Sequence, residues 1–163
     1  MNHKSVSVLF LFFSFTLLFS CGRKQEQARI EPAATPKQGE PDITVTGAER
    51  MREMYEHKEA GGYGPNPSSR SDASFKGHAG NEFVVVHLEV KAPAGAQQFT
   101  IDNPMLYDNA GKEYPGIAES MTLSGLRQTA KKADIPFELP QGTQLKTLKF
   151  GDYSFDLQKL SIK

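Results

Sequence analysis

The sequence predicts an all-β protein, an antiparallel β-sandwich of about seven strands over residues 42–163. Two observations support this fold class. Apolar and polar residues alternate in several short runs, and Gly, Pro, Asn and Asp separate these runs. Helical spacing of apolar residues, by contrast, is confined to one short stretch. The segment also has the length of a seven-strand sandwich.

The clearest predicted strand is NEFVVVHLEVK at residues 81–91. One face is aliphatic from Val84 to Val90, whereas the other begins with Phe83 and turns polar at His87. This pattern is typical of an antiparallel sheet that has one wet face. An earlier run at residues 42–49 alternates β-branched residues and predicts the first strand.

Turn residues place the later strands. Asp108 to Gly111 predicts a hairpin turn between residues 105–107 and 112–114, with Gly where a positive φ is needed. Pro136 cannot donate a ladder hydrogen bond, so residues 133–140 are expected at a sheet edge or bulge. Two regions stay open: Gly151-Asp152 is a hairpin turn or a bulge, and residues 119–130 are a loop or a short strand.

Residues 50–75 form an insertion after the first predicted strand. Met51, Met54, Tyr55 and Lys58 fall at helical spacing, which predicts one or two helical turns. Residues 61–72 are rich in Gly, Pro and Ser, and we expect a long disordered loop there.

The N-terminus reads as a signal peptide over residues 1–20. Lys4 supplies a short basic region, and residues 5–20 are uncharged and apolar. This run is shorter than the roughly 20 apolar residues of a comfortable membrane span. The alternative is an uncleaved membrane anchor, with Arg23 and Lys24 as part of the stop signal.

Cys21 is the only cysteine of the chain and ends the apolar run, so no intrachain disulfide can form. Leu18, Phe19 and Ser20 precede Cys21, and together with it they resemble the lipobox of bacterial lipoproteins: an aliphatic residue, a variable one, a small one and then Cys. The resemblance implies that the Cys21 thiol is lipidated, palmitate included, and becomes the mature N-terminus. The lipid would hold the protein on the cell membrane or outer membrane, facing the periplasm or exterior. The alternative is a buried thiol inside a membrane segment.

Residues 21–41 read as the lipidated Cys followed by a flexible, disordered tether. The segment is polar, contains three prolines and has Ile30 as its one large apolar residue. Fully extended, it would reach roughly 65–70 Å.

Longer stretches resemble an immunoglobulin-like domain that is widespread in bacterial lipoproteins and secreted proteins. They are DITVTGAE, FKGHAGNEFVVVHLEVK, FTIDNPMLYDNAGKEYP and ADIPFELPQGTQLKTLKFGDYSFDL. This family is related in fold to a mycobacterial secreted immunoprotective antigen and has no assigned general function. The resemblance covers most of residues 42–157 and implies an immunoglobulin-like sandwich. Two departures are the Ala-Pro-Ala-Gly at residues 92–95 and the long insertion. The chain also lacks the Cys pair and Trp of antibody domains.

The composition and motifs argue against several function classes. A net charge of zero gives no basic excess for nucleic-acid binding. No nucleophile elbow, calcium-binding loop or phosphate-binding loop is present. We therefore expect a non-enzymatic protein without a cofactor.

The most plausible activity is binding of a protein or other ligand through loops, in addition to attachment to the membrane through the N-terminal lipid. The loop that carries Tyr63 and Arg70 is the candidate surface, because both residue types are enriched in interfaces. An alternative is copper binding by Met51, Met54 and His57, since thioethers and imidazole suit Cu(I). His78 and His87 are expected to be solvated.

Overall fold

The computed structural model describes residues 28–34, 39–58, 61–126, 129–160 and 162. This part of the chain is all-β, with a single 3-10 turn near the C-terminus, η1 (Leu157–Lys159), and it confirms the predicted fold class. The strands are β1 (Asp42–Met51), β2 (Glu53–Glu56), β3 (Tyr63–Gly64), β4 (Ala73–Lys76), β5 (Asn81–Lys91), β6 (Gln98–Asp102), β7 (Met105–Asp108), β8 (Glu113–Pro115), β9 (Ser120–Ser124), β10 (Lys131–Pro140), β11 (Leu145–Phe150) and β12 (Tyr153–Asp156).

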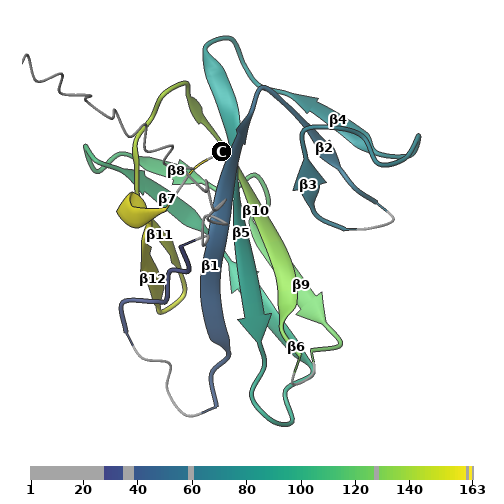
Figure 1. The fold of residues 1–163 in the computed structure, drawn as a ribbon, viewed down its shortest axis with the longest axis vertical. Coiled ribbons are helices and arrows are strands. Elements are labelled where there is room, and N and C mark those ends of the chain that lie inside the picture. Colours follow the sequence, from purple (N-terminus) through teal and green to yellow (C-terminus); the bar gives the residue numbers. More distant parts are fainter. Residues whose placement is uncertain (1–27, 35–38, 59–60, 127–128, 161, 163) are drawn as a thin grey trace, which may run out of the picture.

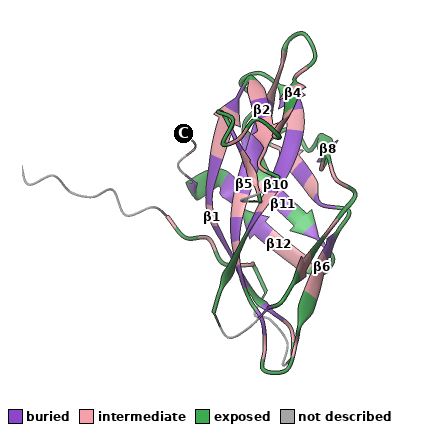
Figure 2. Cartoon of the chain, turned by 90° about the vertical axis from the view of Figure 1, so that its right-hand side faces the viewer, coloured by how far each residue is buried: buried purple, intermediate pink, exposed green. Residues whose placement is uncertain are grey.

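Two antiparallel sheets enclose the main core (Figure 1). One sheet has the strand order β1-β5-β10, and the other has the order β12-β11-β7-β8. Their inner faces contribute the largest fully buried side chains, among them Leu88, Phe137, Leu148 and Phe155. Buried and partly exposed positions alternate along the second half of β5, from Val86 to Lys91, and β1 and β10 carry a mixture of both (Figure 2). A two-stranded ribbon, β6-β9, packs Phe99, Met121 and Leu123 against the same core.

The described residues form twelve short strands, whereas the sequence predicts about seven. Much of the excess comes from the insertion, which contains neither the helical turns nor the fully irregular loop that we expected. It forms a third sheet, with the order β3-β2-β4. The helical prediction is wrong because Met54 pairs with Phe75 across two strands, in a two-residue period that buries Met54 completely.

This third sheet covers the outer face of β5 where β5 begins. Phe83 and Val85 lie on that outer face and are buried together with Met51 and Met54. Tyr63, along with Phe75, packs against this second cluster. The outer face of β5 is therefore apolar at Phe83 and Val85, where the third sheet covers it, and becomes polar from His87, where that cover ends.

Strand edges and turns follow the sequence closely. β10 is an edge strand, as Pro136 predicts, and the Pro136 carbonyl accepts a hydrogen bond from Ile117 N at 2.9 Å. Gly111 and Gly151 have φ of 81° and 51° in the two predicted turns, and Gly151-Asp152 joins β11 to β12 as a hairpin. The open region after residue 119 contains strand β9.

The predicted tether contacts the domain well before residue 42. Ile30 forms an antiparallel bridge with Val45 of β1, with both backbone hydrogen bonds at 2.8 Å. Ala33 N then donates to Ser154 O of β12 at 2.7 Å, so this segment joins one edge of both sheets. The reason is Ile30 itself, whose half-buried side chain packs on the core. From Cys21 to Ile30 an extended chain spans about 30 Å, not the 65–70 Å expected.

Replacing Ile30 tests this docking. Ile30→Ala removes a half-buried side chain and should lower the free energy of unfolding by about 1–2 kcal/mol, which is below the 2–5 kcal/mol expected for the fully buried Ile43→Ala. Urea unfolding of the two variants and the parent protein measures both values. An Ile30→Ala variant as stable as the parent would contradict the docked segment.

Candidate functional site

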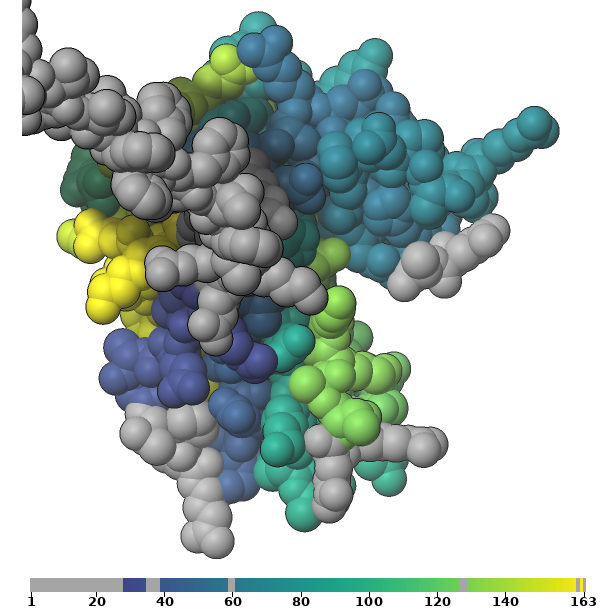
Figure 3. Space-filling view, in the orientation of Figure 1, coloured from purple at the N-terminus to yellow at the C-terminus, as the bar shows by residue number. Residues whose placement is uncertain are grey.

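A groove of about 520 Å³ separates the insertion from the β6-β9 ribbon, along the free edge of β10. Figure 3 shows it as an indentation between the insertion and β9. The residues that line it come from β2 and its following turn, β3, β9 and β10: Glu56, His57, Lys58, Gly61, Gly62, Tyr63, Met121, Leu123, Lys132, Ala133 and Asp134.

The Asp134 carboxylate joins three strands at the centre of this groove. It lies 2.8 Å from Nδ1 of His87 on β5 and accepts a hydrogen bond from Tyr63 N on β3 at 3.1 Å. A smaller adjoining cavity of about 200 Å³ shares Asp134 and Lys132 with the groove and adds His87 and Thr46. The two cavities therefore adjoin each other at Lys132 and Asp134, on the outer side of the first sheet.

Two glycines allow the insertion to approach Asp134. Gly61 and Gly62 have φ of 74° and 88°, values that residues other than Gly rarely adopt. A Cβ on Gly62 would lie 2.3 Å from Asp134 Oδ2, whereas a Cβ on Gly61 would meet no atom within 4 Å. The sequence GGYG thus places the Tyr63 amide against the carboxylate.

His57 supports the same turn from the insertion side. Its Nδ1 lies 3.1 Å from Asp72 Oδ2, and its ring packs so close to Gly64 that a Cβ there would lie 2.7 Å from Nε2. Burial of the Asp72 carboxyl acts to raise its pKa. Hydrogen bonds from the hydroxyls and backbone N–H groups of Ser69 and Ser68 outweigh this effect and hold the pKa of Asp72 well below its usual range.

The groove carries both charged and apolar walls. Lys58 and Lys132 are exposed, and neither forms an ion pair within the described part of the chain. Burial raises the pKa of the Tyr63 hydroxyl, and the charges of Glu56 and Asp134 raise it further. Three side chains that belong to the core or pack on it, Met121, Leu123 and Ala133, form the apolar wall. This arrangement provides binding contacts of several kinds but no nucleophile held beside a base.

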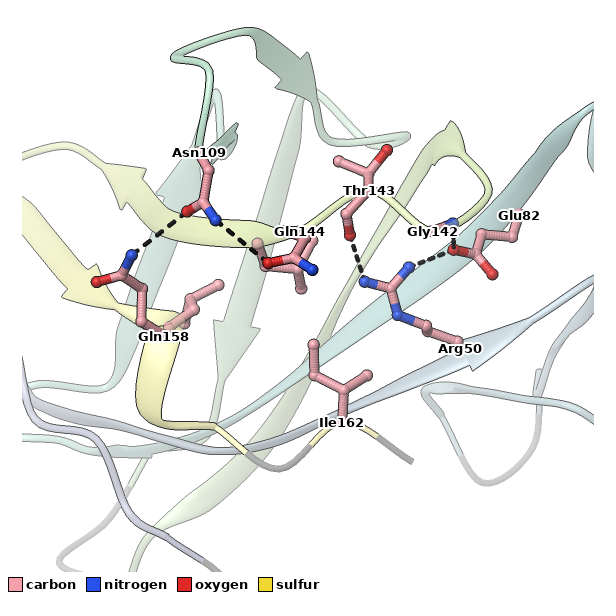
Figure 4. Close-up of a pocket in the computed structure, with 10 residues that line it drawn as sticks. Arg50, Glu82, Asn109, Gly142, Thr143, Gln144, Gln158 and Ile162 are labelled. Carbon is pink, nitrogen blue, oxygen red and sulfur yellow. Dashed lines mark hydrogen bonds and ion pairs between the residues drawn. The ribbon is translucent and has the colours of Figure 1, made fainter.

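A second cavity, of about 590 Å³, lies at the end of the sandwich near η1 (Figure 4). Its charged groups satisfy one another. Arg50 contacts the Glu82 carboxylate and the Thr143 carbonyl, and Glu82 also accepts from Gly142 N at 3.0 Å. These contacts hold the β10–β11 turn against β1 and β5. Because Lys58 and Lys132 in the groove beside β10 have no ion partner among the described residues, this groove is the better candidate site.

The predicted binding and metal residues lie in different parts of the structure. Tyr63 lines the groove, whereas Arg70 is exposed elsewhere on the insertion. Met51 and Met54 are buried in the apolar cluster, and His57 bonds with Asp72. The copper hypothesis thus loses the helical spacing on which it was based and stays an untested prediction. Among the described residues, no three His, Cys, Asp or Glu side chains gather as a metal site.

The other predicted positions divide similarly. Cys21, the signal peptide and about half of the tether lie outside the described residues. The His78 side chain is 86% exposed, as expected, and pairs with Glu138. The His87 side chain is 30% exposed and its Nδ1 lies 2.8 Å from Asp134 Oδ1, so it is partly solvated and also held within the fold. Sequence reasoning missed Asp134 and Lys132, because both look like ordinary polar positions of an alternating strand.

No family model, curated protein or solved structure matches this chain. Within the described residues, no helix has both the length and the apolar character needed to cross a membrane.

A glycine pair tests how the insertion docks. Gly61→Ala introduces only backbone strain and should cost about 1–2 kcal/mol of unfolding free energy. Gly62→Ala adds a clash with Asp134 and should cost more, while displacing the Tyr63 amide resonance in an NMR spectrum. Equal costs for the two variants would contradict the close approach.

Acid should weaken the Asp72 cluster. A carboxyl whose pKa is depressed in the folded state stabilises the fold above its unfolded pKa of about 4, and this contribution is lost as the pH falls below that value. We expect Asp72→Asn to be less stable than the parent at pH 7 and to lose less stability between pH 5 and pH 3. Urea unfolding at these pH values measures the difference, and parallel pH profiles would contradict it.

Proposed function

We propose that this protein is a lipid-anchored, extracytoplasmic and non-catalytic binding module, whose ligand occupies the groove beside β10. The observation that carries the proposal is the groove itself. It places Lys58 and Lys132, which form no ion pair within the part of the chain that the structure describes, and the apolar side chains of Met121 and Leu123 around one cavity. Binding sites commonly combine an apolar lining with a few fixed polar groups.

The form of the groove also supports binding rather than a purely structural role. Its polar centre is held by Asp134, which is engaged by His87 and Tyr63, so the surrounding surface is fixed before a ligand arrives. A preorganised surface avoids part of the entropy cost of association. The insertion builds one wall, which gives this departure from the resembled family a function.

Attachment through Cys21 remains part of the proposal. The lipobox-like LLFSC motif supports it, and the docked Ile30 would keep the domain within about 30 Å of the lipid-bearing residue. The proposed location is the cell membrane or outer membrane, with the domain facing the periplasm or exterior.

Mass spectrometry of the protein purified from membranes tests the anchor. We expect a mature chain that begins at an acylated Cys21, and we expect Cys21→Ala to remain unprocessed with residues 1–20 in place. Cleavage at another residue, or an unmodified thiol on the mature chain, would overturn the assignment.

Photo-crosslinking in cells tests the site. A photoreactive amino acid in place of Leu123, inside the groove, should give a discrete adduct in the full chain, while the same group at Ala110, an exposed turn position that does not line the groove, serves as the matched control. Adducts at neither position, or the same adducts at both, would count against binding in this groove.

A further inference from the structure

The edge of β10 that faces the groove has unpaired backbone groups. In an antiparallel strand, the N–H and C=O of one residue point to the same side, and alternate residues point to opposite sides. The Pro136 carbonyl points away from β5, because it accepts from Ile117. Lys132 and Asp134 share this parity, and within the described part of the chain their backbone N–H and C=O groups form no hydrogen bond with a neighbouring strand or loop. An open ladder of two residues therefore lies along the groove.

The rest of the groove fits one extended strand beside this edge. Side chains of an added strand would alternate between two environments. On the core side they would meet the apolar wall of Met121, Leu123 and Ala133. On the other side they would lie near two ammonium groups, of Lys58 and Lys132, and one carboxylate, of Glu56, that is not engaged by a hydrogen bond or ion pair among the described residues. The Asp134 carboxylate already accepts from Tyr63 N and pairs with His87.

From these features, and resting on the proposed function, we propose that the groove binds an extended peptide segment of another protein by β-strand addition to β10, and that this segment alternates apolar with acidic residues. Backbone hydrogen bonds to Lys132 and Asp134 would give affinity, and the two walls would give selectivity. The walls also explain why the occupant is a single strand. The edge is recessed between the insertion and β9, and a second copy of the chain would bring its own walls against these.

A matched pair of variants isolates the backbone contact. Lys132→Ala removes the ammonium group and keeps the outward N–H, whereas Lys132→Pro removes both. The proline should be tolerated, because residue 132, like Pro136 on the same strand, has its backbone nitrogen directed away from β5. Pro136 leaves the pairing with β5 undisturbed. Circular dichroism and urea unfolding verify that each variant is folded, and N-methylation of the peptide gives the same backbone test with the parent protein unchanged.

The experiment selects octapeptides from a random surface-displayed library with the mature lipoprotein in detergent micelles. We expect enrichment of sequences that alternate apolar residues with Asp or Glu. The strongest peptide, resynthesised, should bind Lys132→Ala about ten-fold more weakly than the parent, and Lys132→Pro at least ten-fold more weakly still. N-methylation of alternate peptide residues should abolish binding on one parity and spare it on the other.

The inference would be overturned if the library yielded no enriched peptides, or if the enriched peptides did not alternate apolar with acidic residues. It would also be overturned if the peptide bound Lys132→Ala and Lys132→Pro equally and N-methylation left its affinity unchanged. A concentration-dependent dimer of the lipoprotein that Lys132→Pro abolishes would also overturn it, in favour of a second copy. Crosslinking at Leu123 separates the two proposals. If adducts form there while any of these outcomes is found, the groove binds a ligand by another mode and the proposed function stands.

Discussion

The two-sided burial of β5 is the constraint on which the rest of the structure depends. Its inner face, from Val84 to Val90, lies in the sandwich core, and the outer face at its start, Phe83 and Val85, needs a second cover. The insertion supplies this cover with Met51 and Met54. Once the insertion is held there, its β2–β3 turn reaches β10 and forms one wall of the groove. The candidate site is thus a by-product of covering a strand that is too apolar to face water.

The groove is maintained by polar contacts rather than by further apolar packing. Asp134 accepts from Tyr63 N and pairs with His87, and the close approach of Gly62 leaves no space for a side chain between them. Polar contacts of this kind specify geometry, because a displaced partner leaves a half-buried carboxylate with fewer donors. This explains how a small three-stranded sheet can keep a defined position on the sandwich.

Local patterns predicted the elements that depend on local physics. The alternation in residues 81–91, the Gly111 and Gly151 turns and the edge position of Pro136 all follow from backbone geometry and appear in the structure. The insertion did not follow, because Met51 and Met54 fit a helical period equally well and only the exposed face of β5 decides between the two. The role of Asp134 could not be predicted from the sequence for a related reason. Its role depends on Tyr63, 71 residues earlier, and no local pattern encodes that contact.

The docked N-terminal segment has a mechanical consequence. Tension between a membrane-bound Cys21 and the domain would first load the ion pair of Arg29 with Glu89, the two backbone bonds of Ile30 with Val45 and the single bond of Ala33 with Ser154. These bonds can break one after another while both sheets keep their own ladders. Their release would lengthen the connection from about 30 Å to roughly 65–70 Å. Under the proposed lipid anchor, the segment would act as an extensible link, short at rest and long under load, whose length depends on the docking of residues 29–33.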